Sequence, residues 1–229
     1  MATRIIPEPP LERAPGPRAS SDGSTLLQGR PDDSERKPSR WWLGVFVGSF
    51  VSLPTGWLLS YGAALPFLLG LFFFVLFGLI LGAIVFRITG RGFKVGRTPL
   101  VLGTTLIVSL AWSMSIYEEA RGFPTEISYQ ASASTRDLAG QSVQEFRSAI
   151  ANAVRGFLAR TYPPGGTIGY VRWVLLRGEV GPEDIPGLPR TIVRDQRGIF
   201  WAIRAILSVG LLAFGVGSQT LGLQESKAS

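Results

Sequence analysis

Residues 41–86 read WWLGVFVGSFVSLPTGWLLSYGAALPFLLGLFFFVLFGLILGAIVF and contain no Asp, Glu, Lys or Arg. About 20 helical residues cross a hydrocarbon core about 30 Å thick, so this stretch is long enough to cross it twice. Four residues near the middle of the stretch can turn the chain: Pro54, Gly56, Gly62 and Pro66. The stretch therefore predicts a helical hairpin in a membrane, with helices over about 41–60 and 64–86.

Two later apolar stretches predict a third helix over about 99–117 and a fourth over about 199–223. Aromatic residues lie near the ends of these stretches, as is typical of the interface between a membrane and water. The predicted fold class is an all-α integral membrane protein with about four transmembrane helices. An even number of crossings places both ends of the chain on the same side of the membrane.

Two terminal segments and one internal segment lie outside the predicted spans. Residues 1–40 combine many prolines with Ser, Gly and mixed charges, which predicts a disordered tail, and residues 224–229 form a short polar tail. Residues 118–198 are the main segment outside the membrane. Within them, apolar residues spaced three and four apart predict one amphipathic helix over about 135–160. Residues 170–177 can form either a short strand or an interfacial helix.

The amphipathic helix has an apolar stripe that must be buried. The stripe can pack against the membrane surface, against the rest of its own segment, or against a partner protein. Its polar side is not strongly cationic, which favours packing on protein over packing on lipid. We therefore expect a partner-facing stripe formed by Val143, Phe146, Ile150 and Phe157.

Small residues recur at four-residue spacing in the predicted spans. Such spacing is typical of faces at which two membrane helices approach closely, although glycine is also common in membrane helices generally. The candidate helix-packing residues are Gly44, Gly48, Ser52, Gly78, Gly82, Gly210 and Gly217.

The formal net charge of +7 comes mainly from a short loop without acids. Cations beside two membrane spans indicate orientation, with the loop in the cytoplasm and contacting lipid headgroups, rather than binding of nucleic acid. The candidate headgroup and orientation residues are Arg87, Arg91, Lys94, Arg97, Trp41 and Trp42. We expect a bacterial plasma (inner) membrane, cytoplasmic N- and C-termini, and residues 118–198 on the opposite side.

Charged residues near the last two spans are interpreted as solvated. Glu118 and Glu119 follow the third span and are expected to be hydrated, and Arg204 is expected to extend to the membrane interface. The acids at Glu179, Glu183 and Asp184 are expected to form a solvated turn. With no His and no Cys in the chain, imidazole bases, thiol nucleophiles and their metal sites are excluded.

These observations predict no catalytic residue, no cofactor site and no metal site. The expected function is that of a non-catalytic packing, anchoring or assembly subunit of a membrane protein complex. The alternative is a transport or permeation component that acts as an oligomer, and a membrane enzyme is a third possibility. The expected partners are the lipid bilayer and either a membrane protein or further copies of this chain.

Overall fold

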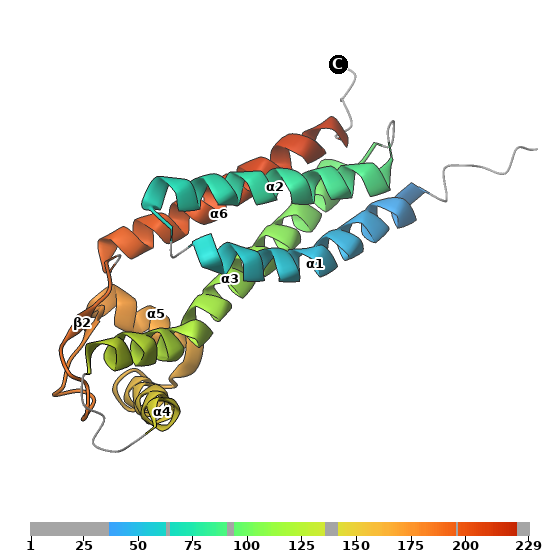
Figure 1. The fold of residues 1–229 in the computed structure, drawn as a ribbon. Coiled ribbons are helices and arrows are strands. Elements are labelled where there is room, and N and C mark those ends of the chain that lie inside the picture. The colour runs from blue at the N-terminus through green and yellow to red at the C-terminus, as the bar shows by residue number, and fades with distance from the viewer. Residues whose placement is uncertain (1–36, 63–64, 91–93, 136–141, 196, 224–229) are drawn as a thin grey trace, which may run out of the picture. The chain divides into compact units, whose positions relative to one another are not determined.

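Four long helices dominate the computed structural model, which describes residues 37–62, 65–90, 94–135, 142–195 and 197–223 (Figure 1). By length and composition, each is apolar enough to cross a membrane. The prediction of a mostly helical chain with four such helices is confirmed. These helices are α1 (Lys37–Tyr61), α2 (Phe67–Thr89), α3 (Arg97–Ser134) and α6 (Ile199–Thr220), and a short 3-10 turn, η2 (Leu221–Leu223), follows α6.

The tails predicted from the sequence lie mostly outside the described residues. Residues 1–36 of the predicted N-terminal tail and all of the C-terminal tail, 224–229, are outside them. Residues 37–40, which were assigned to the tail, instead begin α1. The first helix therefore starts one turn earlier than its apolar residues indicate.

The α1–α2 connection turns where the sequence predicts. The backbone N–H of Leu65 donates to the carbonyl of Gly62 at 3.2 Å, and Pro66 is the N-cap residue of α2. Pro54, by contrast, lies inside α1 and does not end it. Of the four candidate turn residues, Gly62 and Pro66 thus lie at the connection, whereas Pro54 and Gly56 lie within α1.

The bundle consists of α1, α2, α6 and residues 97–117 of α3. In it α2 packs along α6, while α1 packs along both α2 and α3 (Figure 1). Its core is formed by large apolar side chains that include Trp41, Leu59, Leu81, Ile107 and Leu212. Most remaining apolar side chains of the bundle point outward.

The cap consists of the described residues of 118–198. It contains the second half of α3, α4 (Val143–Thr161), α5 (Gly166–Leu176) and two short antiparallel strands. These strands are β1 (Glu179–Val180) and β2 (Ile192–Val193), with Glu179 paired to Val193. The cap has a core of its own, which includes Phe123, Val154, Tyr170, Trp173 and Ile185.

The third helix extends 17 residues past Tyr117, the residue at which the predicted span ends. Polar residues begin there, but apolar ones continue at helical spacing. Ala120, Phe123, Ile127 and Ala131 are all buried in the cap core. The helix continues with this second apolar stripe, which is buried in the cap core.

The amphipathic helix begins later than predicted, at Val143 rather than near residue 135. Its start is fixed by a capping box, in which the Ser142 hydroxyl accepts from the Glu145 N–H and the Glu145 carboxylate accepts from the Ser142 N–H. Residues 170–176 belong to α5, so the strand alternative for this stretch is wrong.

Candidate functional site

A carboxylate on α3 is buried at the junction of the bundle and the cap. Glu119 belongs to the continuous part of α3, and only 5% of its side chain is exposed. It follows Arg97 by 22 residues, which is about 33 Å along an α-helix. The carboxylate therefore lies one hydrocarbon thickness away from the N-terminal end of α3.

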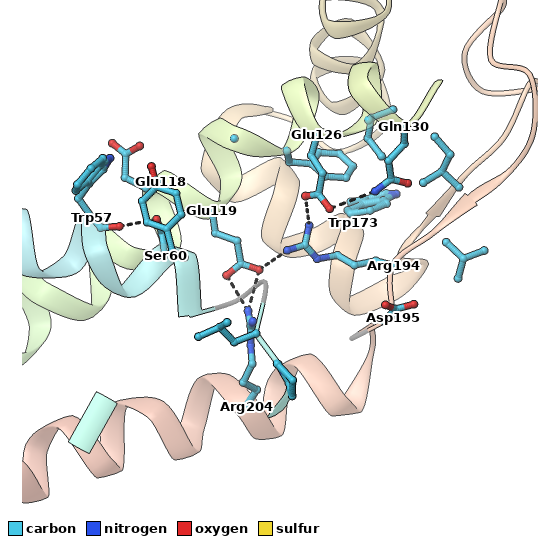
Figure 2. Close-up of a pocket in the computed structure, with 18 residues that line it drawn as sticks. Trp57, Ser60, Glu118, Glu119, Glu126, Gln130, Trp173, Arg194, Asp195 and Arg204 are labelled. Carbon is cyan, nitrogen blue, oxygen red and sulfur yellow. Dashed lines mark hydrogen bonds and ion pairs between the residues drawn. The ribbon is translucent and has the colours of Figure 1, made fainter. Parts of the chain in front are cut away.

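Four donors converge on this carboxylate. The Nη2 atom of Arg204, from α6, lies 2.8 Å from Oε1 and 2.7 Å from Oε2. Nη2 of Arg194, just after β2, lies 2.8 Å from Oε1, and the Tyr170 hydroxyl of α5 donates to the same atom at 2.8 Å. The indole Nε1 of Trp201 is 3.3 Å away. The Glu119 carboxylate thus joins α3 to α5, α6 and the β2 segment. Figure 2 shows its contacts with Arg204 and Arg194.

Arg194 extends this cluster toward the surface of the cap. Its Nη1 lies 3.3 Å from Oε2 of Glu126, whose side chain is 53% exposed. Its guanidinium carbon also lies 5.5 Å from the centre of the Tyr170 ring. The two arginines and two glutamates balance in formal charge, so we define Glu119, Arg204, Arg194, Tyr170 and Glu126 as the junction cluster.

Tyr170 is held in its neutral form by this environment. The residue is 0% exposed, and burial, together with the Glu119 carboxylate that it donates to, raises the pKa of its phenol well above the ordinary value. Its ring packs on Phe123 and Trp173 with centroids 5.3 and 5.9 Å away. The hydroxyl is thus fixed as a donor.

An open cleft of about 690 Å³ lies beside the junction cluster. One side is formed by the end of α1 and the start of α2, including Trp57, Ser60 and Pro66, and the other by α3 and the β2 segment (Figure 2). A second, much smaller cavity of about 10 Å³ lies on the bundle side of Glu119, where Ser115 and Ser208 contribute to its wall.

The geometry supports a structural role for the ion pair. A buried carboxylate is stable in its charged form only when it is paired and its lone pairs are satisfied. Both oxygens of Glu119 accept hydrogen bonds, and the donors come from elements on both sides of the junction. The cluster therefore fixes the position of the cap on the bundle.

Sequence reasoning placed Glu119 in solvent and Arg204 at the membrane interface, and the structure instead joins the two in a buried ion pair. Arg204 points to Glu119 and only 11% of its side chain is exposed. A signal was present: an arginine one turn inside an apolar span needs an acidic partner, and Glu119 ends another span at the same level. The contributions of Tyr170 and Trp201 had no comparable signal in the sequence.

The predicted packing residues separate into two groups. A Cβ on Gly44 or Gly48 would meet side chains of α2 or α3 within 3 Å, and Ser52 is fully buried. A Cβ on Gly78 or Gly82 would lie within 3 Å of α6 atoms. For the last two members, Gly210 and Gly217, no described atom of a neighbouring segment lies within 4 Å of a Cβ.

The predicted headgroup residues also differ in position. Arg87, Lys94, Arg97 and Trp42 are exposed, whereas Arg91 lies outside the described residues. Trp41 is 2% exposed, and its Nε1 donates to the carbonyl of Pro99 at 3.2 Å. Trp41 therefore packs between α1 and α3 instead of facing headgroups, which corrects its assignment.

The predicted partner-facing stripe is covered by the cap itself. Ile150 and Phe157 are 3% and 4% exposed and belong to the cap core, and Phe146 packs against it. Only Val143 is exposed, at 45%. Of the three ways of burying this stripe, the structure uses the rest of its own segment, so a partner is not needed to cover it.

Comparisons of the chain with protein-family models, with curated proteins and with solved structures gave no match. The geometry of the bundle, the cap and the junction cluster is therefore the basis on which function is assigned.

Proposed function

We propose that the chain is an integral membrane protein that acts as a non-catalytic anchoring or assembly subunit of a membrane protein complex. In this proposal the bundle spans a bacterial plasma membrane and the cap stands at the surface opposite the cytoplasm. The cap then presents a folded surface at a fixed height to a membrane protein partner or to further copies of this chain.

The outward side chains of the bundle support a position in lipid. Large apolar residues on all four helices are more than half exposed, a pattern that is unfavourable in water and ordinary in a bilayer. They include Phe46, Phe50, Leu68, Phe72, Leu102, Ile206 and Phe214.

The charges at the far end of the bundle support the orientation. Arg40, Arg87, Lys94 and Arg97 are exposed near the ends of α1, α2 and α3 that lie away from the cap (Figure 1). Cations of short loops are retained in the cytoplasm. Both termini are then cytoplasmic, and the cap is on the other side.

The junction cluster is the observation that carries the proposal. Glu119 lies on a helix that is shared by the bundle and the cap, and it binds Arg204 of the bundle and Arg194 of the cap at 2.7 to 2.8 Å. A cap attached by one continuous helix and a buried ion pair cannot swing freely. Such a fixed cap is suited to holding a partner in register with the membrane.

Purification from the native membrane in mild detergent tests the proposal. We expect the wild-type chain to carry a stoichiometric membrane protein or to form a defined oligomer, identified by mass spectrometry and intact-complex mass. Glu119→Gln should reduce this association, whereas the matched variant Glu126→Gln, which alters an exposed partner of the same Arg194, should retain it. A homogeneous particle that contains a single copy of this chain alone would contradict the proposal.

Cysteine accessibility tests the orientation separately. The chain has no native cysteine, so each introduced thiol reports one position. In intact cells, an impermeant maleimide should label Ser148→Cys in the cap and should not label Lys94→Cys until the membrane is opened. The reverse pattern would invert the orientation.

A permeation role is the second candidate, and one observation favours it. The Glu119–Arg204 pair has open space on both sides, in the cleft of about 690 Å³ and in the small cavity beside Ser115 and Ser208. At about 10 Å³, however, that cavity has room for about one water at most. Ion or solute flux into liposomes that contain this chain alone would favour permeation over anchoring.

A further inference from the structure

Four exposed apolar side chains lie on the two segments that adjoin where the cap joins the last helix of the bundle. Leu175 and Leu176 at the end of α5 are 40% and 77% exposed, and Ile199 and Phe200 at the start of α6 are 70% and 67% exposed. We define these four residues as the junction ridge. Exposed apolar clusters of this kind indicate an interaction surface.

The two halves of the junction ridge are tied together by backbone hydrogen bonds. The N–H of Gly198, the residue before α6, donates to the carbonyl of Val174 in α5 at 2.8 Å. The N–H groups of Arg177 and Gly178, the two residues after α5, both donate to the carbonyl of Trp173 at 2.9 Å and close the last turn of the helix. The end of α5 therefore lies directly beside the start of α6.

The leucines of the ridge have no room to turn inward. On the opposite side of α5, Tyr170, Trp173 and Val174 are at most 1% exposed and fill the cap core. The indole of Trp173 is also fixed, because its Nε1 donates to the carbonyl of Glu179 at 3.0 Å. The exposure of Leu175 and Leu176 is thus a property of the packed cap.

The ridge continues the outward apolar face of α6. Ile199, Ile203 and Ile206 follow one another at four- and three-residue spacing, so they lie on one side of the helix, and all three are exposed. The 22 residues of α6 span about 33 Å, close to one hydrocarbon thickness. If α6 crosses the membrane, its first residue and the adjoining end of α5 lie at the edge of the hydrocarbon.

We propose that the junction ridge inserts into the lipid leaflet on the cap side, so that α5 is a second membrane contact of the cap. This inference rests on the proposed membrane location of the bundle. The occupant is lipid, because the ridge is continuous with the outward face of α6 and carries no charge. Arg177 and Arg197 follow and precede the two halves of the ridge in the chain, and each is ion-paired at 2.7 Å, to Asp184 and Glu179 respectively.

Spin labels placed by cysteine substitution in the full chain test this contact. We would label Leu176→Cys, Phe214→Cys on the outward face of the bundle, and Ser148→Cys on the exposed side of α4, each reconstituted in phosphatidylcholine vesicles. Collisions with oxygen, which concentrates in lipid, are compared with collisions with a water-soluble nickel chelate. Leu175→Cys serves as a second reporter of the ridge.

We expect the oxygen-to-nickel ratio at Leu176 and Leu175 to be several-fold higher than at Ser148 and to approach that at Phe214. A ratio at both leucines equal to that at Ser148, with Phe214 still in lipid, would overturn the ridge contact and leave the membrane location intact. A water-like ratio at Phe214 would contradict the membrane location itself. Spin–spin broadening at Leu176 that disappears on dilution with unlabelled chain would identify a second copy as the occupant and overturn the lipid assignment.

Discussion

The Nη2 atom of Arg204 in α6 lies within 2.8 Å of both carboxylate oxygens of Glu119 in α3. This contact joins two helices at the level where the apolar bundle ends and the cap begins. Burial of both side chains removes the screening by water that makes most surface ion pairs weak. The pair is therefore the point at which a single substitution should most weaken the packing of the cap on the bundle.

Replacing Glu119 with Gln should lower the free energy of unfolding by about 3–5 kcal/mol, since Arg204 and Arg194 would be left buried beside a neutral amide. Chemical unfolding in a mild detergent, followed by tryptophan fluorescence, would measure the loss. The control is Glu126→Gln, which removes an exposed partner of Arg194 and should change stability by about 1 kcal/mol or less. Equal losses in the two variants would show that the contribution of the Glu119–Arg204 pair to the free energy of unfolding does not depend on its burial.

Gly78→Ala should weaken the packing of α2 on α6. A Cβ at Gly78 would lie 2.7 Å from the backbone oxygen of Leu212, so the two helices must move apart. Overpacking of this kind costs about 1–3 kcal/mol. Thermal unfolding in detergent should detect it.

Gly210→Ala is the matched control for Gly78→Ala. Both glycines lie in long apolar helices, but a Cβ at Gly210 meets no described atom of another segment within 4 Å. The variant should have nearly wild-type stability. A large loss at Gly210 would instead indicate that another chain packs on this face of α6.

Tyr170 should resist ionisation in the folded protein. Burial raises the pKa of its phenol, so as the pH rises the unfolded state loses this proton before the folded state does. The contribution of the neutral Tyr170 to the free energy of unfolding is therefore lost as the pH rises above about 10. Near pH 10 the folded wild type and folded Tyr170→Phe should have the same phenolate absorbance. When both are denatured, the wild type should have the additional absorbance of one tyrosine, since it has five and the variant four. A difference in the folded state would show that the Tyr170 hydroxyl is accessible to solvent.

The start of α4 should become less stable at acidic pH. The hydroxyl and backbone N–H of Ser142 lower the pKa of Glu145. The stabilisation of the helix start by the Glu145 carboxylate is therefore present above the ordinary carboxyl pKa and is lost as the pH falls through the lowered value. The protection of the first turn of α4 against hydrogen exchange, measured relative to the intrinsic exchange rate at each pH, should fall over that range. In Ser142→Ala the exchange should already be fast at neutral pH, and an unchanged rate would exclude the capping box as the cause.

The membrane-length helices could be predicted from the sequence because apolar length is a property of each segment alone. Residues 41–86 show this directly, because they contain no charged residue and are long enough for two membrane-length helices. The extension of α3 could not be predicted in the same way. Glu118 and Glu119 mark the end of an apolar run, and only the cap, formed by residues much later in the chain, shows that the next stripe is buried.

Helical spacing gave the packing candidates but not their neighbours. Gly78 and Gly210 belong to similar small-residue patterns, yet one faces α6 and the other faces outward, because the pattern identifies a helix face without specifying which helix covers it. The same limit applies to the stripe of α4. Ile150 and Phe157 required burial, and the sequence left open whether lipid, a partner or the cap itself provided it.

The separation of Glu119 and Arg204 along the chain also sets an order for biosynthesis. Arg204 follows Glu119 by 85 residues, which a ribosome adds in roughly 4–17 s. For that interval α3 carries its acid without the partner from α6, and the cap is synthesised before the helix that holds it in place. The Glu119–Arg204 contact therefore cannot form until α6 has been synthesised.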